Sequence, residues 1–154
     1  MSGRSLKPFV ILCVFVLCIF RFHPCFASPF PVKGEIYDKN EQRVGTADVY
    51  PRYVEIIDNE GRMLGKVGIL VEKGIARLFL VDSRKGNILV GYASGGKIFD
   101  DRDKLRGTYF WTPTWSFVYT PDGKRAGKVR CIAWPRVCAV GVGGFLLDLF
   151  QENQ

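Results

Sequence analysis

The chain has 154 residues, of which 47% are hydrophobic and 24% are charged, and its formal net charge is +7 at pH 7. This length and composition suit one globular domain or a small membrane protein. Positive and negative residues are interspersed, without the basic stripe that a phosphate backbone requires, so a nucleic-acid partner is not expected.

Residues 1–27 have the pattern of a secretory signal. Basic residues precede an uninterrupted apolar run, "FVILCVFVLCIF", at residues 9–20. About twelve apolar residues suit a signal-peptide core, whereas a membrane span needs roughly 20. We therefore predict cleavage after Ala27 and a periplasmic or secreted protein. The alternative is an uncleaved anchor facing the periplasm or exterior, because Phe22 and Phe26 extend the apolar stretch; membrane contact is expected only in that case.

The remaining chain, 28–154, has a formal charge of about +4 and begins with a Pro-rich lead-in at residues 28–34. A phrase that starts with two apolar residues, passes through a turn and reaches a glycine then recurs five times. Its copies are "IYDKNEQRVGTA", "IIDNEGRMLGKV", "LVDSRKGNILVGYA", "IFDDRDKLRGTY" and "VYTPDGKRAGKV". The third copy carries two extra residues.

Each phrase is interpreted as a β-hairpin. The turns open at Asp38, Asp58, Asp82, Asp100 and Thr120. "DNEGR" and "TPDGK" are typical of a type I turn closed by a left-handed glycine, and the opening Asp accepts hydrogen bonds from backbone N–H groups of the turn. A second set of turn signals separates the phrases, which predicts an up-and-down meander of roughly eleven strands.

The glycine that ends each phrase lies on the apolar, inward face of its strand by two-residue alternation. These glycines are Gly45, Gly65, Gly91, Gly107 and Gly127. An inward glycine in every copy indicates that structure crowds together there. We therefore predict an all-β fold of about five quasi-repeated hairpins around a pseudo-symmetry axis, closed or nearly closed, because an open sheet would leave exposed edges.

The Asp-turn-Gly hairpins with a following "GKV" or "GTA" resemble the beta-flower repeat domains of bacteria, over about residues 35–131. That resemblance implies hairpins arranged around an axis, without a settled activity or functional residues. A weaker resemblance, carried by "IYDKNEQRVG", is to the tyrosine-aspartate repeat proteins of secreted shells.

Cys131 and Cys138 are the two cysteines beyond the signal. The intervening "IAWPRV" is interpreted as a turn at residues 134–136, so the two thiols are expected to face each other near the base of a hairpin and to form a disulfide. The alternative is a pair of buried, unpaired cysteines. No further Cys or His is available for zinc.

The repeat domain is expected to end at residue 138. No helix is expected before residue 139. Residues 139–154 are predicted to be a capping segment, in which "FLLDLF" forms a last strand or a short helix over one end of the meander.

The sequence offers few groups for catalysis. The single His, His23, lies in the signal, so no catalytic triad or Cys-His pair is available. Asp100, Asp101 and Asp103 form the densest acidic group, but we interpret them as a solvated turn rather than a calcium loop. We expect no enzyme activity, no metal and no cofactor.

The stretch "YFWTPTWSF" at residues 109–117 is rich in aromatic residues. Alternation places Tyr109 and Trp111 inward. The possible ligand platform consists of Tyr109, Trp111, Trp115 and Trp134. Core packing is the favoured interpretation of these rings, and the ligand platform is the alternative.

The function predicted from the sequence is an exported, non-enzymatic β-repeat module of the bacterial cell envelope with a binding or structural role. Its expected partner is an envelope protein or a polysaccharide. The alternative is a lectin-like carbohydrate binder or, less favoured, a carbohydrate-active protein.

Overall fold

The computed structural model describes residues 30–70, 74–82 and 84–151, so the predicted signal or anchor lies outside the described residues. The described residues form ten strands and a helix. In chain order the elements are β1 (Val32–Asp38), β2 (Arg43–Val49), β3 (Tyr53–Asp58), β4 (Met63–Leu70), β5 (Ile75–Asp82), β6 (Gly86–Ser94), β7 (Lys97–Asp100), β8 (Leu105–Trp111), β9 (Trp115–Tyr119), β10 (Arg125–Arg130) and α2 (Pro135–Leu146).

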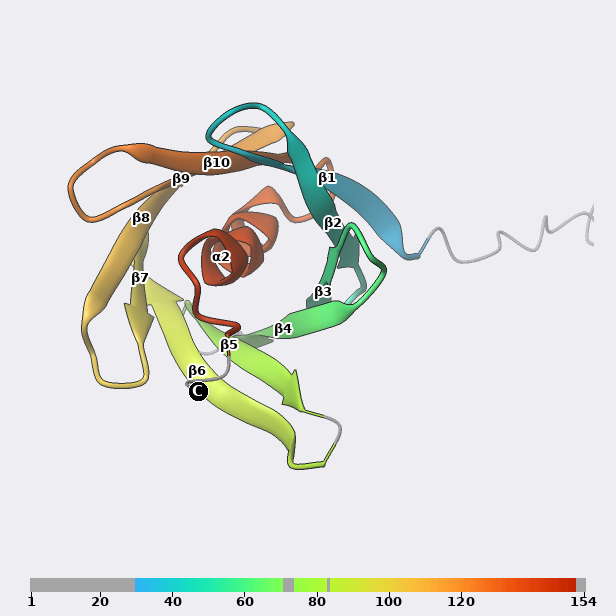
Figure 1. Cartoon of the computed structure of the whole chain (residues 1–154), viewed down its shortest axis with the longest axis vertical. Coiled ribbons are helices and arrows are strands. Elements are labelled where there is room, and N and C mark those ends of the chain that lie inside the picture. Colours follow the sequence, from blue (N-terminus) through green and yellow to red (C-terminus); the bar gives the residue numbers. More distant parts are fainter. Residues whose placement is uncertain (1–29, 71–73, 83, 152–154) are drawn as a thin grey trace, which may run out of the picture.

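The strands form a closed barrel in which each strand is antiparallel to both neighbours (Figure 1). Closure is made by β1 and β10, which pair from Glu35↔Arg130 to Asp38↔Gly127. The predicted meander of five hairpins around an axis is confirmed. The count of roughly eleven strands is wrong by one, because helix α2 begins where a last turn and strand were expected.

The five repeated turns gather at one end of the barrel, which we call the Asp-turn end. Asp58 Oδ1 accepts hydrogen bonds from the backbone N–H groups of Glu60 and Arg62, both at 2.9 Å. Asp38 and Asp100 make the same pair of contacts in their own turns. Gly61 has a φ of 80°, as expected for the left-handed closing residue of such a turn.

The inward face of the wall is apolar. The register shifts by one residue within every hairpin, which is the signature of a β-bulge. At this bulge four of the five repeated glycines lie against the backbone of the adjacent strand: a Cβ on Gly45 would collide with Ile57 O, and one on Gly91 with Phe99 O. A Cβ on Gly65 would instead collide with the Phe150 ring. The crowding expected at these glycines therefore arises between neighbouring strands as well as toward the axis.

Helix α2 lies inside the barrel, near the centre of the ring of strands (Figure 1). It packs against β1 to β5 and β7 to β10, and its residues 137–144 are all buried. Gly141 and Gly144 make room for this packing, since a Cβ at Gly141 would lie 2.8 Å from Ile56 Cδ1 and one at Gly144 would lie 2.6 Å from Leu78 Cδ2. The expectation of no helix before residue 139 is wrong. It rested on the absence of an amphipathic pattern, and a helix that is apolar on all sides has no such pattern.

After α2 the chain turns across the Asp-turn end. Leu147, Leu149 and Phe150 are buried there, so part of "FLLDLF" does cover one end of the barrel. The preceding residues fill the interior as well, which the sequence reasoning did not foresee. Among the described residues, no helix has the length and apolar character needed to span a bilayer.

The opposite end, which we call the disulfide end, holds the start of α2. Cys131, just after β10, and Cys138, in the first turns of α2, form a disulfide. The hairpin expected between them is wrong: Trp134 adopts a φ of 55°, and Pro135 is the first residue of the helix. A proline suits this position because the first turn of a helix does not use its N–H. The disulfide thus ties the helix inside the barrel to the wall, and it indicates an oxidising compartment.

Candidate functional site

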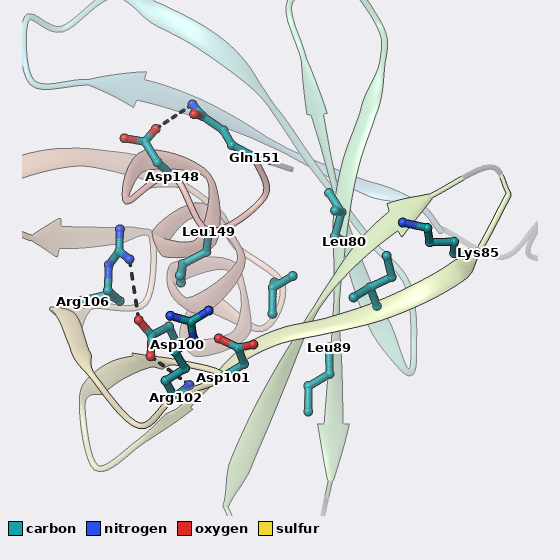
Figure 2. Close-up of a pocket in the computed structure, with 12 residues that line it drawn as sticks. Leu80, Lys85, Leu89, Asp100, Asp101, Arg102, Arg106, Asp148, Leu149 and Gln151 are labelled. Atoms are coloured by element: carbon teal, nitrogen blue, oxygen red, sulfur yellow. Dashed lines mark hydrogen bonds and ion pairs between the residues drawn. The ribbon is translucent and has the colours of Figure 1, made fainter. Parts of the chain in front are cut away.

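A cavity of about 580 Å³ opens at the Asp-turn end, between the β5–β6 hairpin and the residues that follow α2 (Figure 2). One part of its lining is apolar, formed by Leu80, Ile88, Leu89, Val90 and Leu149. The other part is polar, formed by Lys85, Asp100, Asp101, Arg102, Arg106, Asp148 and Gln151. Since α2 fills the barrel, a ligand has access to the ends of the molecule rather than to its axis.

The β5–β6 hairpin extends beyond its neighbours because the third repeat is longer. β6 pairs with β5 along residues 86–93, but with β7 only along residues 91–94. No described strand pairs with the other edge of residues 86–90. In the other four hairpins, the one-sided stretch next to the turn is two or three residues long. The cavity therefore lies beside a five-residue free strand edge.

The free edge carries exposed apolar side chains. Leu89 is 46% exposed, whereas Ile88 and Val90 are half-buried. Leu80 and Leu149 flank the same cavity from β5 and from the C-terminal segment (Figure 2). A free edge with apolar side chains is an unusual combination, because natural proteins commonly protect such edges with charges, prolines or covering loops.

Asp100 and Arg106 form the polar wall that faces this edge. Arg106 Nη1 lies 3.6 Å from Asp100 Oδ2, and Arg106 Nη2 donates a 3.2 Å hydrogen bond to the carbonyl of Leu147. Arg106 therefore joins the β7–β8 turn to the C-terminal segment. Burial raises the pKa of Asp100, but hydrogen bonds from the backbone N–H groups of its turn and the Arg106 guanidinium outweigh burial and hold this pKa below its usual value.

Asp100, Asp101 and Asp103 remain separate in the structure rather than sharing one site. Asp100 is engaged by its own turn, and Asp103 accepts a 2.9 Å hydrogen bond from the hydroxyl of Tyr92. This contact raises the pKa of Tyr92. Within the described part of the chain, no group of three or more His, Cys, Asp or Glu residues could hold a metal ion.

The four residues of the predicted aromatic platform do not form one surface. Tyr109 is buried and its hydroxyl accepts a hydrogen bond from Arg136 Nε at 3.4 Å. Trp111 and Trp134 are 46% and 41% exposed. Trp111, which was expected on the inward face, is the last residue of β8 and is open to solvent rather than packed in the core. Both tryptophans lie at the disulfide end: Trp111 pairs with Ser116, and the Ser116 hydroxyl donates a 2.7 Å hydrogen bond to the carbonyl of Pro135, the residue after Trp134.

Trp115 belongs to the outer wall instead. Its ring centroid is 6.1 Å from that of Tyr37, and Lys128 Nζ lies 4.7 Å from the Trp115 ring. Lys128 also forms an ion pair with Glu41, whose pKa is lowered by that contact. These partners lie against the indole ring, so Trp115 is less available to a ligand than Trp111 or Trp134.

The sequence reasoning missed the residues of the free edge. The available signal was the length of the third repeat, in which "GNILV" follows the turn and contains three consecutive apolar residues. An extra two residues in one hairpin of a closed barrel must project beyond the strands beside it, because those strands end earlier. The opposite polar wall could not be inferred in this way, since it depends on where the segment after α2 crosses the barrel.

No protein-family model, curated protein or solved structure matches this chain.

Proposed function

We propose that this protein is an exported, non-enzymatic binding module of the bacterial cell envelope, which captures an extended segment of a partner protein along the free edge of β6. The single observation that carries the proposal is the one-sided pairing of residues 86–90 beside the 580 Å³ cavity. The finer placement among the beta-flower repeat domains is part of the same proposal, supported by the five bulged hairpins around one axis.

Strand addition explains why the edge and the cavity lie together. An added strand forms hydrogen bonds with the free main-chain groups of β6, which provides affinity, while alternate side chains of the partner enter the cavity and provide specificity. The apolar side chains of Leu89 and Leu149 suit an apolar residue of the partner. Arg102 and Asp101, on the polar wall, suit charged residues at its flanks.

Export to a periplasmic or extracellular location is supported by two features. The first is the Cys131–Cys138 disulfide, because disulfides persist in oxidising compartments. The second is the leader-like sequence of residues 1–27.

A binding rather than catalytic role is supported by the chemistry of the cavity. Its lining contains no His, Cys or Ser that could act as a nucleophile. Asp100 is engaged by the N–H groups of its turn and is kept ionised by its lowered pKa, which makes it a poor proton donor at neutral pH.

The test is selection of short random peptides on the purified protein, followed by amide hydrogen exchange with a selected peptide. We expect new protection of amides within residues 86–90. Leu89→Lys should weaken the selected peptide roughly tenfold or more, because it places an ammonium group against an apolar ligand side chain. Met63→Lys is the matched control, since Met63 is 38% exposed on β4 and does not line the cavity.

Three results would contradict the proposal. Peptides that bind the Leu89→Lys variant as tightly as the parent protein would place binding elsewhere. Amide protection by the peptide that is confined to elements other than β6 would also place binding elsewhere. Concentration-dependent dimerisation that Leu89→Lys abolishes, without selection of any peptide, would assign the edge to a second copy of this chain.

A further inference from the structure

The disulfide end of the barrel has a concentration of exposed hydrophobic side chains. Six large hydrophobic residues are exposed in the described part of the chain, and four of them lie at this end. They are Phe110, Trp111, Ile132 and Trp134, with exposed fractions of 60%, 46%, 69% and 41%. All four belong to β8 or to the segment between β10 and α2, and backbone contacts hold these parts together: Cys131 N–H donates to the carbonyl of Thr114, just beyond β8.

The same end carries an excess of positive charge. Its described loops, the two terminal residues of each strand there and the first turn of α2 contain five cations and one carboxylate. The cations are Lys33, Arg52, Lys97, Arg130 and Arg136, and the single carboxylate is that of Asp48. Asp48 Oδ2 lies 3.9 Å from Lys33 Nζ, so these two charges offset each other and the excess comes from the other four cations. At the Asp-turn end, by contrast, acidic and basic residues are interspersed along the turns and many form ion pairs.

The chain that precedes the barrel also joins it at this end. β1 begins at Val32, which pairs with Val49 at the end of β2. Gly34 lies against Arg130 and Cys131, close to the exposed Ile132. The apolar run at residues 9–20 is therefore connected to the barrel beside the exposed aromatic side chains.

We propose that the disulfide end is a membrane-docking surface, which rests on a bilayer containing anionic lipids. Tryptophan side chains favour the interface between lipid and water, because the indole ring is apolar and its N–H is polar. Arg and Lys side chains beside them are attracted to anionic head groups. In this orientation the β6 edge and its cavity point away from the membrane, where a partner protein has access to them. The docking surface and the peptide site share no residue, so an experiment can disprove either proposal without affecting the other.

Tryptophan fluorescence tests this surface selectively, because the chain contains three Trp residues and all three lie in the β8–α2 region. The full chain is reconstituted with vesicles of phosphatidylcholine and phosphatidylglycerol that carry bromine on the acyl chains, which quenches nearby indoles. We expect strong quenching. The double variant Trp111→Phe/Trp134→Phe should lose it, because Trp115 lies on the outer wall beneath Lys128. Trp115→Phe should retain it.

The contribution of charge is tested by Arg52→Glu/Arg130→Glu, which should lose most of the quenching. Lys39→Glu/Arg84→Glu is the matched control, since it makes the same change in net charge with residues that are exposed in turns of the Asp-turn end. Quenching by pure phosphatidylcholine vesicles should be weaker than by the mixture.

The proposal is overturned if vesicle-associated protein shows no quenching, or if the quenching persists in the Trp111→Phe/Trp134→Phe variant. It is also overturned if Arg52→Glu/Arg130→Glu and Lys39→Glu/Arg84→Glu show the same quenching by the brominated vesicles. A saturable change in Trp emission with a soluble cell-wall glycan, without quenching by brominated lipid, would assign Trp111 and Trp134 to carbohydrate instead.

Discussion

The wall of the barrel and the helix inside it differ in what each derives from its own local sequence. The hairpins of the wall contain their own turn signals, such as Asp58, whose carboxylate accepts the N–H groups of its turn. Helix α2 has no side-chain cap, no acidic residue in its first turn and no basic residue in its last turn. It also contains three glycines, which are poor helix formers. The wall can form from local interactions, whereas the helix depends on the interior that surrounds it.

A substitution that fills the space between helix and wall should have the largest effect. Gly144→Leu adds a side chain where a Cβ already lies 2.6 Å from Leu78 Cδ2 and from Phe150 Cζ. We expect it to lower the free energy of unfolding by about 3 kcal/mol, as overpacking of a rigid core does. Chemical denaturation followed by circular dichroism measures this change.

Gly68→Leu is the matched control for that substitution. Gly68 lies in β4 of the wall, and a Cβ there would meet one atom within 4 Å, Phe79 Cε2 at 3.6 Å. We expect a change below about 1 kcal/mol, typical of partly exposed positions. Equal destabilisation by both substitutions would show that the interior is no more tightly packed than the wall.

Removal of the disulfide should have the next largest effect, because it releases the start of the helix from the wall. Replacing both Cys131 and Cys138 with Ser should cost about 2 kcal/mol, the value expected for a short closed loop. Hydrogen exchange should then increase most in α2, while the hairpin amides keep their protection. Uniform loss of protection would show that the wall does not persist without the helix.

A turn substitution in the wall should have the smallest effect. Asp100→Ala removes the acceptor of two backbone N–H groups and the partner of Arg106, so we expect a loss of about 1 kcal/mol at neutral pH. Asp101→Ala, at the next position, should be close to neutral. The pKa of Asp100 is lower in the folded protein than in the unfolded chain, where it is about 4. The ionised carboxylate therefore stabilises the folded state above this unfolded-state pKa, and the stabilisation is lost as the pH falls through the folded-state pKa.

The difference in unfolding free energy between the parent protein and Asp100→Ala should therefore shrink on acidification below about pH 4. Urea denaturation at several pH values measures it. A difference that stays constant over this range would mean that the charge of Asp100 contributes nothing to the turn.

Much of the wall could be predicted from the sequence. The turn at residues 58–61 has the expected opening Asp and closing left-handed glycine, and the inward glycines lie in the core. The residues of the candidate site could be predicted from the sequence only in part. The projection of Leu89 follows from the longer third repeat, but the position of Leu149 opposite it depends on the path of the chain after α2.

The sequence by itself determined the five hairpins, their turn chemistry and the alternation of inward and outward residues, because each of these depends on residues close together in the chain. The tertiary structure decided the rest. The segment at residues 135–146 is helical because the closed wall offers it an apolar interior, in which a helix satisfies its own backbone hydrogen bonds. That helix excludes ligands from the axis. The end of β8 and the start of α2 place the exposed tryptophans at one end of the barrel, and the segment after α2 completes the cavity beside β6 at the other.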